Sequence, residues 1–207
     1  MDINLNGEFN KIIKSIDTSN KPNLFLHVCC APCSSATLEK LYNYFNIYIL
    51  FYNPNIDTSS EYTKRYNELI KLLAIKKYDI SIIYENYDHD TFLNYIKGYE
   101  NLPEGDKRCE LCFKLRLKTT LDYVINYINS NNLSDTVNYL CTTLSISPHK
   151  NVKLIYDIGI NLCKDTIVRY LPSDFKKEDG YLNSIKLSKK YNLYRQDYCG
   201  CEFSKHA

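Results

Sequence analysis

Residues 24–52 read LFLHVCCAPCSSATLEKLYNYFNIYILFY, and this stretch decides the fold. It opens with a short apolar run, residues 24–28, that suits a buried strand. It closes with residues 47–52, a β-branched and aromatic run that predicts a second strand. Residues 34–45, between the two, carry apolar side chains at helical spacing. A strand, a helix and a strand in this order predict a βαβ unit whose two strands are parallel.

The same alternation continues toward the C-terminus. Thr58 and Glu61 have the spacing of a capping box, which predicts a helix that ends near Lys76. Ser147 and Pro148 resemble an N-cap followed by proline at the first helical position. Further strands are expected at residues 79–84, 136–142 and 166–171, and further helices at residues 89–97, 109–129, 148–163 and 181–191. Five strands alternating with helices predict an α/β fold with a doubly wound parallel sheet, whose ligands bind at the carboxyl ends of the strands.

The length of 207 residues fits one domain, or one domain with a small appendage. We assign residues 1–23 to an N-terminal extension and residues 24–207 to a single α/β catalytic domain. Twenty-six Lys and Arg against 24 Asp and Glu give a net charge of +2, which excludes a strongly basic polyelectrolyte binder but not a local basic patch. The first 20 residues lack the apolar core of a signal peptide, and no stretch approaches the roughly 20 apolar residues of a membrane span. We therefore expect a cytoplasmic protein, in which disulfides are unlikely.

Nine cysteines are the unusual feature of the composition. Seven of them fall into three groups: Cys29, Cys30 and Cys33; Cys109 and Cys112; and Cys199 and Cys201. Two of the groups contain the C-x-x-C spacing found in zinc and iron–sulfur sites. One tetrahedral zinc or one [4Fe–4S] cluster takes four thiolates, and the remaining three suit a second metal or a redox-active pair. Spacing alone leaves structural zinc, an iron–sulfur cluster and a redox disulfide as alternatives.

The other two cysteines, Cys141 and Cys163, are expected to be small core residues. No glycine lies between Gly7 and Gly98, so the first strand is not followed by a glycine-rich loop that could approach phosphate. That absence argues against a nucleotide hydrolase or ligase.

Several strings are distinctive enough to indicate a family. They are LHVCCAPCS (26–34), FYNPNI (51–56), EYTKR (61–65), RCELCFKLRL (108–117), TTLSISPHKN (142–151), LPSDFKKEDGY (171–181) and LYRQDYCGCEFS (193–204). Over residues 24–204 the chain resembles the cobalamin-independent epoxyqueuosine reductases, the QueH family. The resemblance implies an oxidoreductase for the last step of queuosine synthesis, the two-electron reduction of epoxyqueuosine at the tRNA wobble position to queuosine. It also implies an adenine-nucleotide α-hydrolase-like (HUP-type) fold with a cysteine-rich C-terminal tail.

The resemblance further implies a [4Fe–4S] cluster, a neighbouring mononuclear metal ion (iron) and an external electron donor of the ferredoxin or flavodoxin kind. The predicted metal ligands, not divided between the two centres, are Cys29, Cys30, Cys33, Cys109, Cys112, Cys199 and Cys201. Cys33 stands where the family alternates between Cys and Asp, so it is a candidate ligand of the second metal. Where the family usually reads N-P-N-I-H-P, this chain has Asp57 in place of the histidine.

Reduction of an epoxide needs protons as well as electrons, and the candidate acids are Asp57, Asp197, Tyr52 and Tyr198. With 20 tyrosines in the chain, each tyrosine is equally well read as core or surface filler. The candidates for binding tRNA are basic residues in or beside the distinctive strings, namely Arg65, Arg108, Arg116, His149, Lys150, Lys176, Lys177 and Arg195, with Phe51 and Phe175 as stacking partners. Each of these charges is equally compatible with a solvated surface, and His149 with a helix cap.

Two other functions remain open at this stage. A zinc-stapled nucleic-acid-binding module would be colourless and would have no redox chemistry. A thiol–disulfide oxidoreductase would need an exposed cysteine of low pKa and no metal.

Overall fold

The computed structural model describes residues 3–205. Its centre is a five-stranded sheet in the order β3-β2-β1-β4-β5, in which every neighbouring pair is parallel. The strands are β1 (Asn23–His27), β2 (Asn46–Phe51), β3 (Ser81–Tyr84), β4 (Asn138–Thr142) and β5 (Val168–Tyr170). The α-helices are α1 (Leu5–Ser15), α2 (Ala31–Leu41), α3 (Ser59–Lys76), α4 (His89–Tyr95), α5 (Lys107–Ser130), α6 (Val152–Cys163) and α7 (Gly180–Lys190). Two 3₁₀ helices, η1 (Thr143–Ile146) and η2 (Glu202–Ser204), complete the set.

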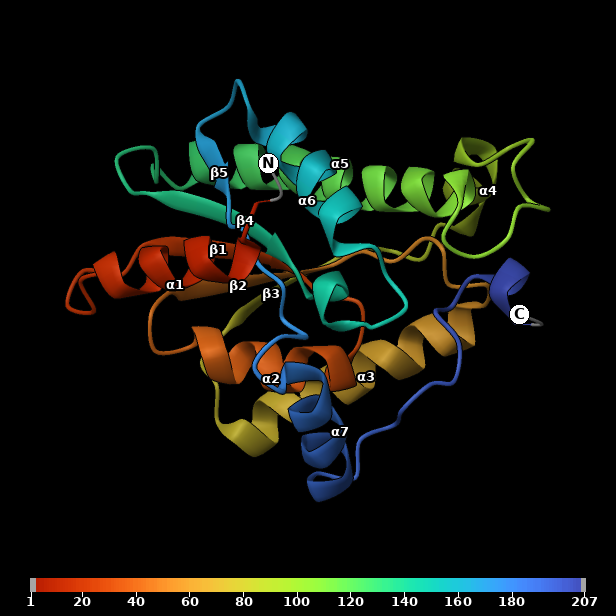
Figure 1. Cartoon of the computed structure of the whole chain (residues 1–207), viewed down its shortest axis with the longest axis horizontal. Helices are drawn as coiled ribbons and strands as arrows, with labels where there is room; N and C mark the ends of the chain where they lie inside the picture. Colours follow the sequence, from red (N-terminus) through yellow and green to blue (C-terminus); the bar gives the residue numbers. More distant parts are fainter. Residues whose placement is uncertain (1–2, 206–207) are drawn as a thin grey trace.

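Helices cover both faces of the sheet, as the doubly wound prediction requires (Figure 1). Alternate residues of β1 divide the core: Leu24 and Leu26 pack on one side with α2, α3 and α7, whereas Phe25 packs on the other with α5 and α6. This alternation follows from the two-residue period of a strand. A third cluster joins α4 to the start of α5 and to the C-terminal segment through Phe92, Cys112 and Cys201.

The predicted elements are present, and several boundaries differ. The Thr58 hydroxyl accepts a hydrogen bond from the Glu61 N–H at 3.2 Å, so the predicted cap of α3 is confirmed. The predicted start of a helix at Pro148 is wrong. A 3₁₀ turn ends at Ile146, and α6 begins four residues after Pro148, at Val152, because Asn151 caps it by accepting from the Leu154 N–H.

The order of the strands determines where the site forms. β1 lies at the point where the chain turns from one half of the sheet to the other, with β2 and β4 as its neighbours. The loops after these three strands therefore meet at one edge, where open α/β sheets bind ligands. They carry Cys29–Cys33, Asn53–Asp57 and the segment from η1 to Lys150.

Candidate functional site

Three cysteines gather at the end of β1. The sulfur atoms of Cys29, Cys30 and Cys33 lie within 4.8 Å of one another, and within residues 3–205 this is the one such group of three metal-ligating side chains. Cys30 is the N-cap residue of α2, so the turn into the helix brings the sulfurs together. Thr143, at the start of η1, accepts from the Cys29 N–H at 3.2 Å and contacts its sulfur at 3.4 Å.

The spacing of these sulfurs suits one shared ion. Cys29 Sγ and Cys30 Sγ are 3.8 Å apart, and a tetrahedral ion with metal–sulfur bonds of about 2.3 Å would separate its ligands by about 3.8 Å. Hydrogen bonds from Cys30 and Cys33 hold the pKa of Cys29 well below its ordinary value. The hydrogen bond to Cys29, together with burial, raises the pKa of Cys30 to about 12, although the contact with Cys33 acts in the opposite direction.

Four further cysteines, Cys109, Cys112, Cys199 and Cys201, line one small cavity of about 30 Å³. The first two lie on the first turns of α5, and the other two lie on the C-terminal segment, residues 194–205, which packs against α4 and α5. Within the described part of the chain, no three of these four sulfurs lie within 4.8 Å of one another. These four cysteines are therefore less closely grouped than Cys29, Cys30 and Cys33.

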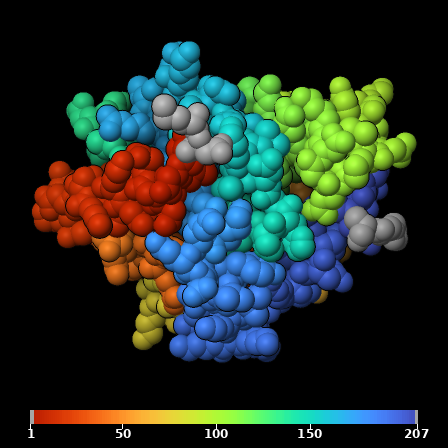
Figure 2. All heavy atoms as spheres, in the orientation of Figure 1, coloured from red at the N-terminus to blue at the C-terminus, as the bar shows by residue number. Residues whose placement is uncertain are grey.

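A cleft of about 570 Å³ opens beside both cysteine groups, and Cys29, Cys33 and Cys199 line it. One wall is the loop from Leu144 to Lys150, and the other is the C-terminal segment from Arg195 to Cys199. Figure 2 shows the segments around residues 100 and 150 and the C-terminal segment meeting on one side of the molecule. The volume falls in the range of small-ligand sites.

Lys150, half-buried, lines both the cleft and the four-cysteine cavity. Burial opposes its charge, but the negative charges of the Cys199 and Cys29 thiolates act the other way, and the pKa of Lys150 is raised above its ordinary value. His149 and Arg195 also line the cleft and are exposed. The Arg195 guanidinium donates to the Tyr181 hydroxyl at 3.1 Å and lies over that ring, 5.5 Å from its centroid.

The three other arginines predicted to contact tRNA are buried, with 2–3% of each exposed. Arg108 donates to the carbonyls of Glu100 and Leu102 and contacts the Phe203 carbonyl. Arg116 contacts Asn53 and His27 beneath the site. Their donors face protein atoms, which favours a role in holding the site together over direct contact with phosphate.

Arg65 is the third of these arginines. It pairs with Glu61 and donates to the carbonyl of Cys199. Burial opposes its charge, but Cys30 and Glu61 raise its pKa above the ordinary value.

Of the four candidate acids, Asp197 and Tyr198 line the cleft, and Asp57 and Tyr52 do not. The Tyr198 hydroxyl donates to Asp57 Oδ1 at 2.8 Å, and Lys205 pairs with the other oxygen. Although burial acts in the opposite direction, these two contacts hold the pKa of Asp57 below its ordinary value. Tyr52 is 7% exposed, and burial raises its pKa.

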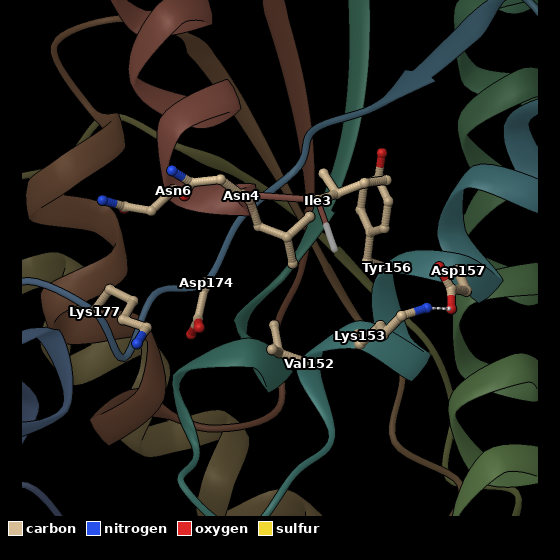
Figure 3. A pocket seen from close by; sticks show the side chains of 10 residues that line it. Ile3, Asn4, Asn6, Val152, Lys153, Tyr156, Asp157, Asp174 and Lys177 are labelled. Atoms are coloured by element: carbon tan, nitrogen blue, oxygen red, sulfur yellow. Dashed lines mark hydrogen bonds and ion pairs between the residues drawn. The ribbon is translucent and has the colours of Figure 1, made fainter. Parts of the chain in front are cut away.

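Lys176 and Lys177 lie away from the cysteines. Lys177 lines a separate pocket of about 350 Å³ between the start of α1, the start of α6 and the loop before α7 (Figure 3). Asp174, at the same pocket, pairs with Lys176 at 3.4 Å. Phe51 and Phe175, the predicted stacking partners, are core residues that are 0% and 2% exposed. The prediction that they stack on a base is therefore wrong, because they lack accessible faces.

Some site residues were not singled out from the sequence as functional. His27 is fully buried, and burial followed by the charge of Arg116 lowers its pKa to about 3. Asn55 lines the four-cysteine cavity and Gln196 the cleft, and each has a buried amide oxygen with no hydrogen-bond partner among the described residues. All three lie in the distinctive strings, and that position is the one feature of the sequence that could have indicated a functional role.

All nine cysteines are free, and Cys141 and Cys163 are buried, as expected for core residues. Within residues 3–205, no helix has both the length and the apolar character that crossing a membrane requires.

Comparison with known proteins gives one consistent result. The sequence profile of the family described as "Epoxyqueuosine reductase QueH" matches residues 24–207. A protein of that name from Streptococcus pyogenes is 36% identical over 190 residues, which cover 90% of this chain and 71% of the relative. Its namesake from Staphylococcus epidermidis is 36% identical over 215 residues (98% and 84%), and that from Thermotoga maritima is 33% identical over 184 residues (87% and 89%).

Proposed function

This chain belongs to the epoxyqueuosine reductase QueH family, and on that premise we propose that its cleft receives the epoxyqueuosine nucleotide of tRNA and that the chain reduces it to queuosine. The observation that carries the proposal is the placement of two cysteine groups next to one cleft, which Cys29, Cys33 and Cys199 line. Residues 24–207 act as the single catalytic domain, with residues 1–23 as an extension.

The two cysteine groups suit different metal centres. Cys109, Cys112, Cys199 and Cys201 line one cavity and supply the four thiolates that a [4Fe–4S] cluster takes. Cys29, Cys30 and Cys33 form the closer group that suits a mononuclear iron. Bound there, the two centres would supply single electrons and a Lewis acid for the epoxide oxygen. An external donor of the ferredoxin or flavodoxin kind would supply the electrons.

The chain's own part is to bind, orient and protonate the substrate. Conversion of the epoxide to an alkene consumes two electrons and two protons, and the oxygen leaves as water. Asp197 and Tyr198 line the cleft and are the candidates to deliver a proton, from a carboxyl oxygen and from the phenol oxygen. Asp57 acts through Tyr198, since it accepts the hydrogen bond of that hydroxyl. The orphan amide oxygen of Gln196 offers an acceptor to a hydroxyl or amine of the substrate.

The accessible basic residues of the cleft are those best placed to hold the RNA backbone. They are His149, Lys150 and Arg195, with Tyr181 beneath the guanidinium of Arg195. The buried Arg65, Arg108 and Arg116 keep the walls of the cleft in place.

The test uses protein purified and reconstituted without air. Supplied with a reductant and tRNA that carries epoxyqueuosine, the chain is expected to yield queuosine, detected by mass spectrometry of the digested nucleosides. Cys109→Ser should lose the iron–sulfur absorbance together with this activity. A colourless, iron-free protein that binds tRNA without reducing it would favour the alternative, a zinc-stapled binding module.

A further inference from the structure

Arg65 lies where the two cysteine groups meet, and it is 2% exposed. One edge of its guanidinium is held by a carboxylate one helical turn earlier: Nε donates to Glu61 Oε1 at 2.6 Å. Glu61 is itself fixed by the hydroxyl of Tyr194, which donates to both carboxylate oxygens at 3.1–3.2 Å. A buried cation held by a partner that is fixed in turn has a well-defined position.

The other edge of the guanidinium supports the turn between Cys199 and Cys201. It donates to the Cys199 carbonyl at 3.1 Å and contacts the Tyr198 carbonyl at 3.5 Å. The turn packs closely against the guanidinium, since a β-carbon added to Gly200 would lie 3.1 Å from an Arg65 nitrogen. Arg65 thus determines where the backbone of Cys199 sits relative to α3.

The charge of Arg65 also lies near the cysteines. It lines the cleft together with Cys29, Cys33 and Cys199. Glu61 is the one carboxylate that pairs with it among residues 3–205, and its other hydrogen-bond partners are neutral carbonyls. Arg65 therefore places a positive charge beside these cysteines, and charged groups around the ligands tune a metal centre.

We propose that Arg65 is a positioning residue of the metal site, which seats Cys199 against the Cys29–Cys33 group and whose fixed charge raises the reduction potential of the cluster. The inference rests on the proposed function, because it requires that these cysteines hold metal. Lysine is not equivalent here, since one ammonium group cannot reproduce the fork that holds Glu61 and both carbonyls.

The experiment compares Arg65→Met and Arg65→Lys with the wild type and with Arg169→Met, which removes an exposed arginine of β5. Iron and sulfide per chain, the electron paramagnetic resonance spectrum of the reduced protein and the midpoint potential are measured after anaerobic reconstitution. For Arg65→Met we expect at least a twofold loss of iron. In the Arg65→Met chains that take up a cluster, we expect the midpoint potential to become more negative by about 59 mV, which corresponds to a tenfold weaker affinity for one electron. Arg65→Lys keeps the charge, so its potential should stay near that of the wild type while its spectrum changes.

Folded Arg65→Met with wild-type iron, spectrum and potential would overturn the inference. If Arg65→Met does not fold, Arg65→Lys decides: an unchanged iron content and spectrum would refute the positioning role. Wild-type chains that take up neither iron nor sulfide would refute the proposed function and this inference together. If the wild type takes up iron and sulfide normally and the Arg65 variants do not differ from it, the inference is refuted and the proposed function is not.

Discussion

Gly200→Ala is the smallest change that tests how the C-terminal segment holds two metal ligands. Gly200 has φ +105°, a backbone conformation that side chains disfavour. Its added β-carbon would lie 2.9 Å from Ile56 Cγ1 and 3.1 Å from an Arg65 nitrogen. Both neighbours are buried, so neither can move away without disturbing the core.

The cost has two parts. Backbone strain contributes about 1–3 kcal/mol, and overpacking against buried neighbours contributes about another 1–3 kcal/mol. The segment can relieve the second part by moving outward, but it then loses the hydrogen bonds of the Cys199 carbonyl to Arg65 and Asn55. Either outcome displaces Cys199 and Cys201, so iron uptake should fall severalfold even where the chain still folds.

Gly98→Ala provides the matched control. Gly98 has φ +87°, and a β-carbon there meets no atom within 4 Å, so the variant carries the strain without the collision. Urea unfolding of the metal-free proteins and iron per chain after reconstitution are the two measurements. We expect Gly98→Ala to load iron like the wild type. Equal unfolding midpoints and equal iron content in the two variants would refute the reasoning.

Three further predictions follow from single sites. Cys109→Ser should lose most of the bound iron, whereas Cys141→Ser, in the core, should retain it; metal analysis distinguishes the two. Arg195→Ala should weaken tRNA binding about tenfold and reduce the salt slope by about 1, measured by fluorescence anisotropy at several salt concentrations. Hydrogen bonds from Asn6, then Lys40 and Asn10, lower the pKa of Glu178 from 4.5 to about 2. The ionised Glu178 therefore stabilises the folded state above pH 4.5, and this contribution is lost as the pH falls toward 2. Glu178→Gln should therefore cost less than about 1 kcal/mol at neutral pH in urea unfolding, and the difference from wild type should shrink by pH 3.

The order and type of the elements could be predicted from residues 24–52 and the repeats of that pattern because hydrophobic periodicity reports burial directly. The start of α6 could not. Pro148 satisfies the rule for a first helical residue, yet Asn151 supplies the side-chain cap and defines the first turn. Two competing caps four residues apart are distinguished by tertiary packing, which local sequence does not encode.

The candidate site shows the same division. The place of Cys29, Cys30 and Cys33 could be predicted, because they follow a central strand of the parallel sheet, whereas Cys109 and Cys112 lie on α5 and could be grouped by their spacing alone. The roles of the basic residues could not, because a charge in sequence looks the same whether it faces phosphate or a buried carbonyl. Arg108 illustrates this: its position beside Cys109 suggested a surface contact, but its guanidinium is directed inward, onto carbonyls of the α4–α5 loop and the Phe203 carbonyl.

The helix that follows β1 shows how a doubly wound sheet can present sulfur atoms where other such sheets bind phosphate. In nucleotide-binding proteins with such sheets, the positive end of that helix receives phosphate over a glycine-rich loop. Here Cys30 is the N-cap residue of α2, with no side-chain cap of its own, and Cys29 and Cys33 flank it. The helix terminus that favours a phosphate also favours a thiolate. Placing cysteines where glycines would stand therefore keeps the preference of the helix terminus for negative charge, and the buried cations Arg65 and Arg116 lie beside and beneath the site.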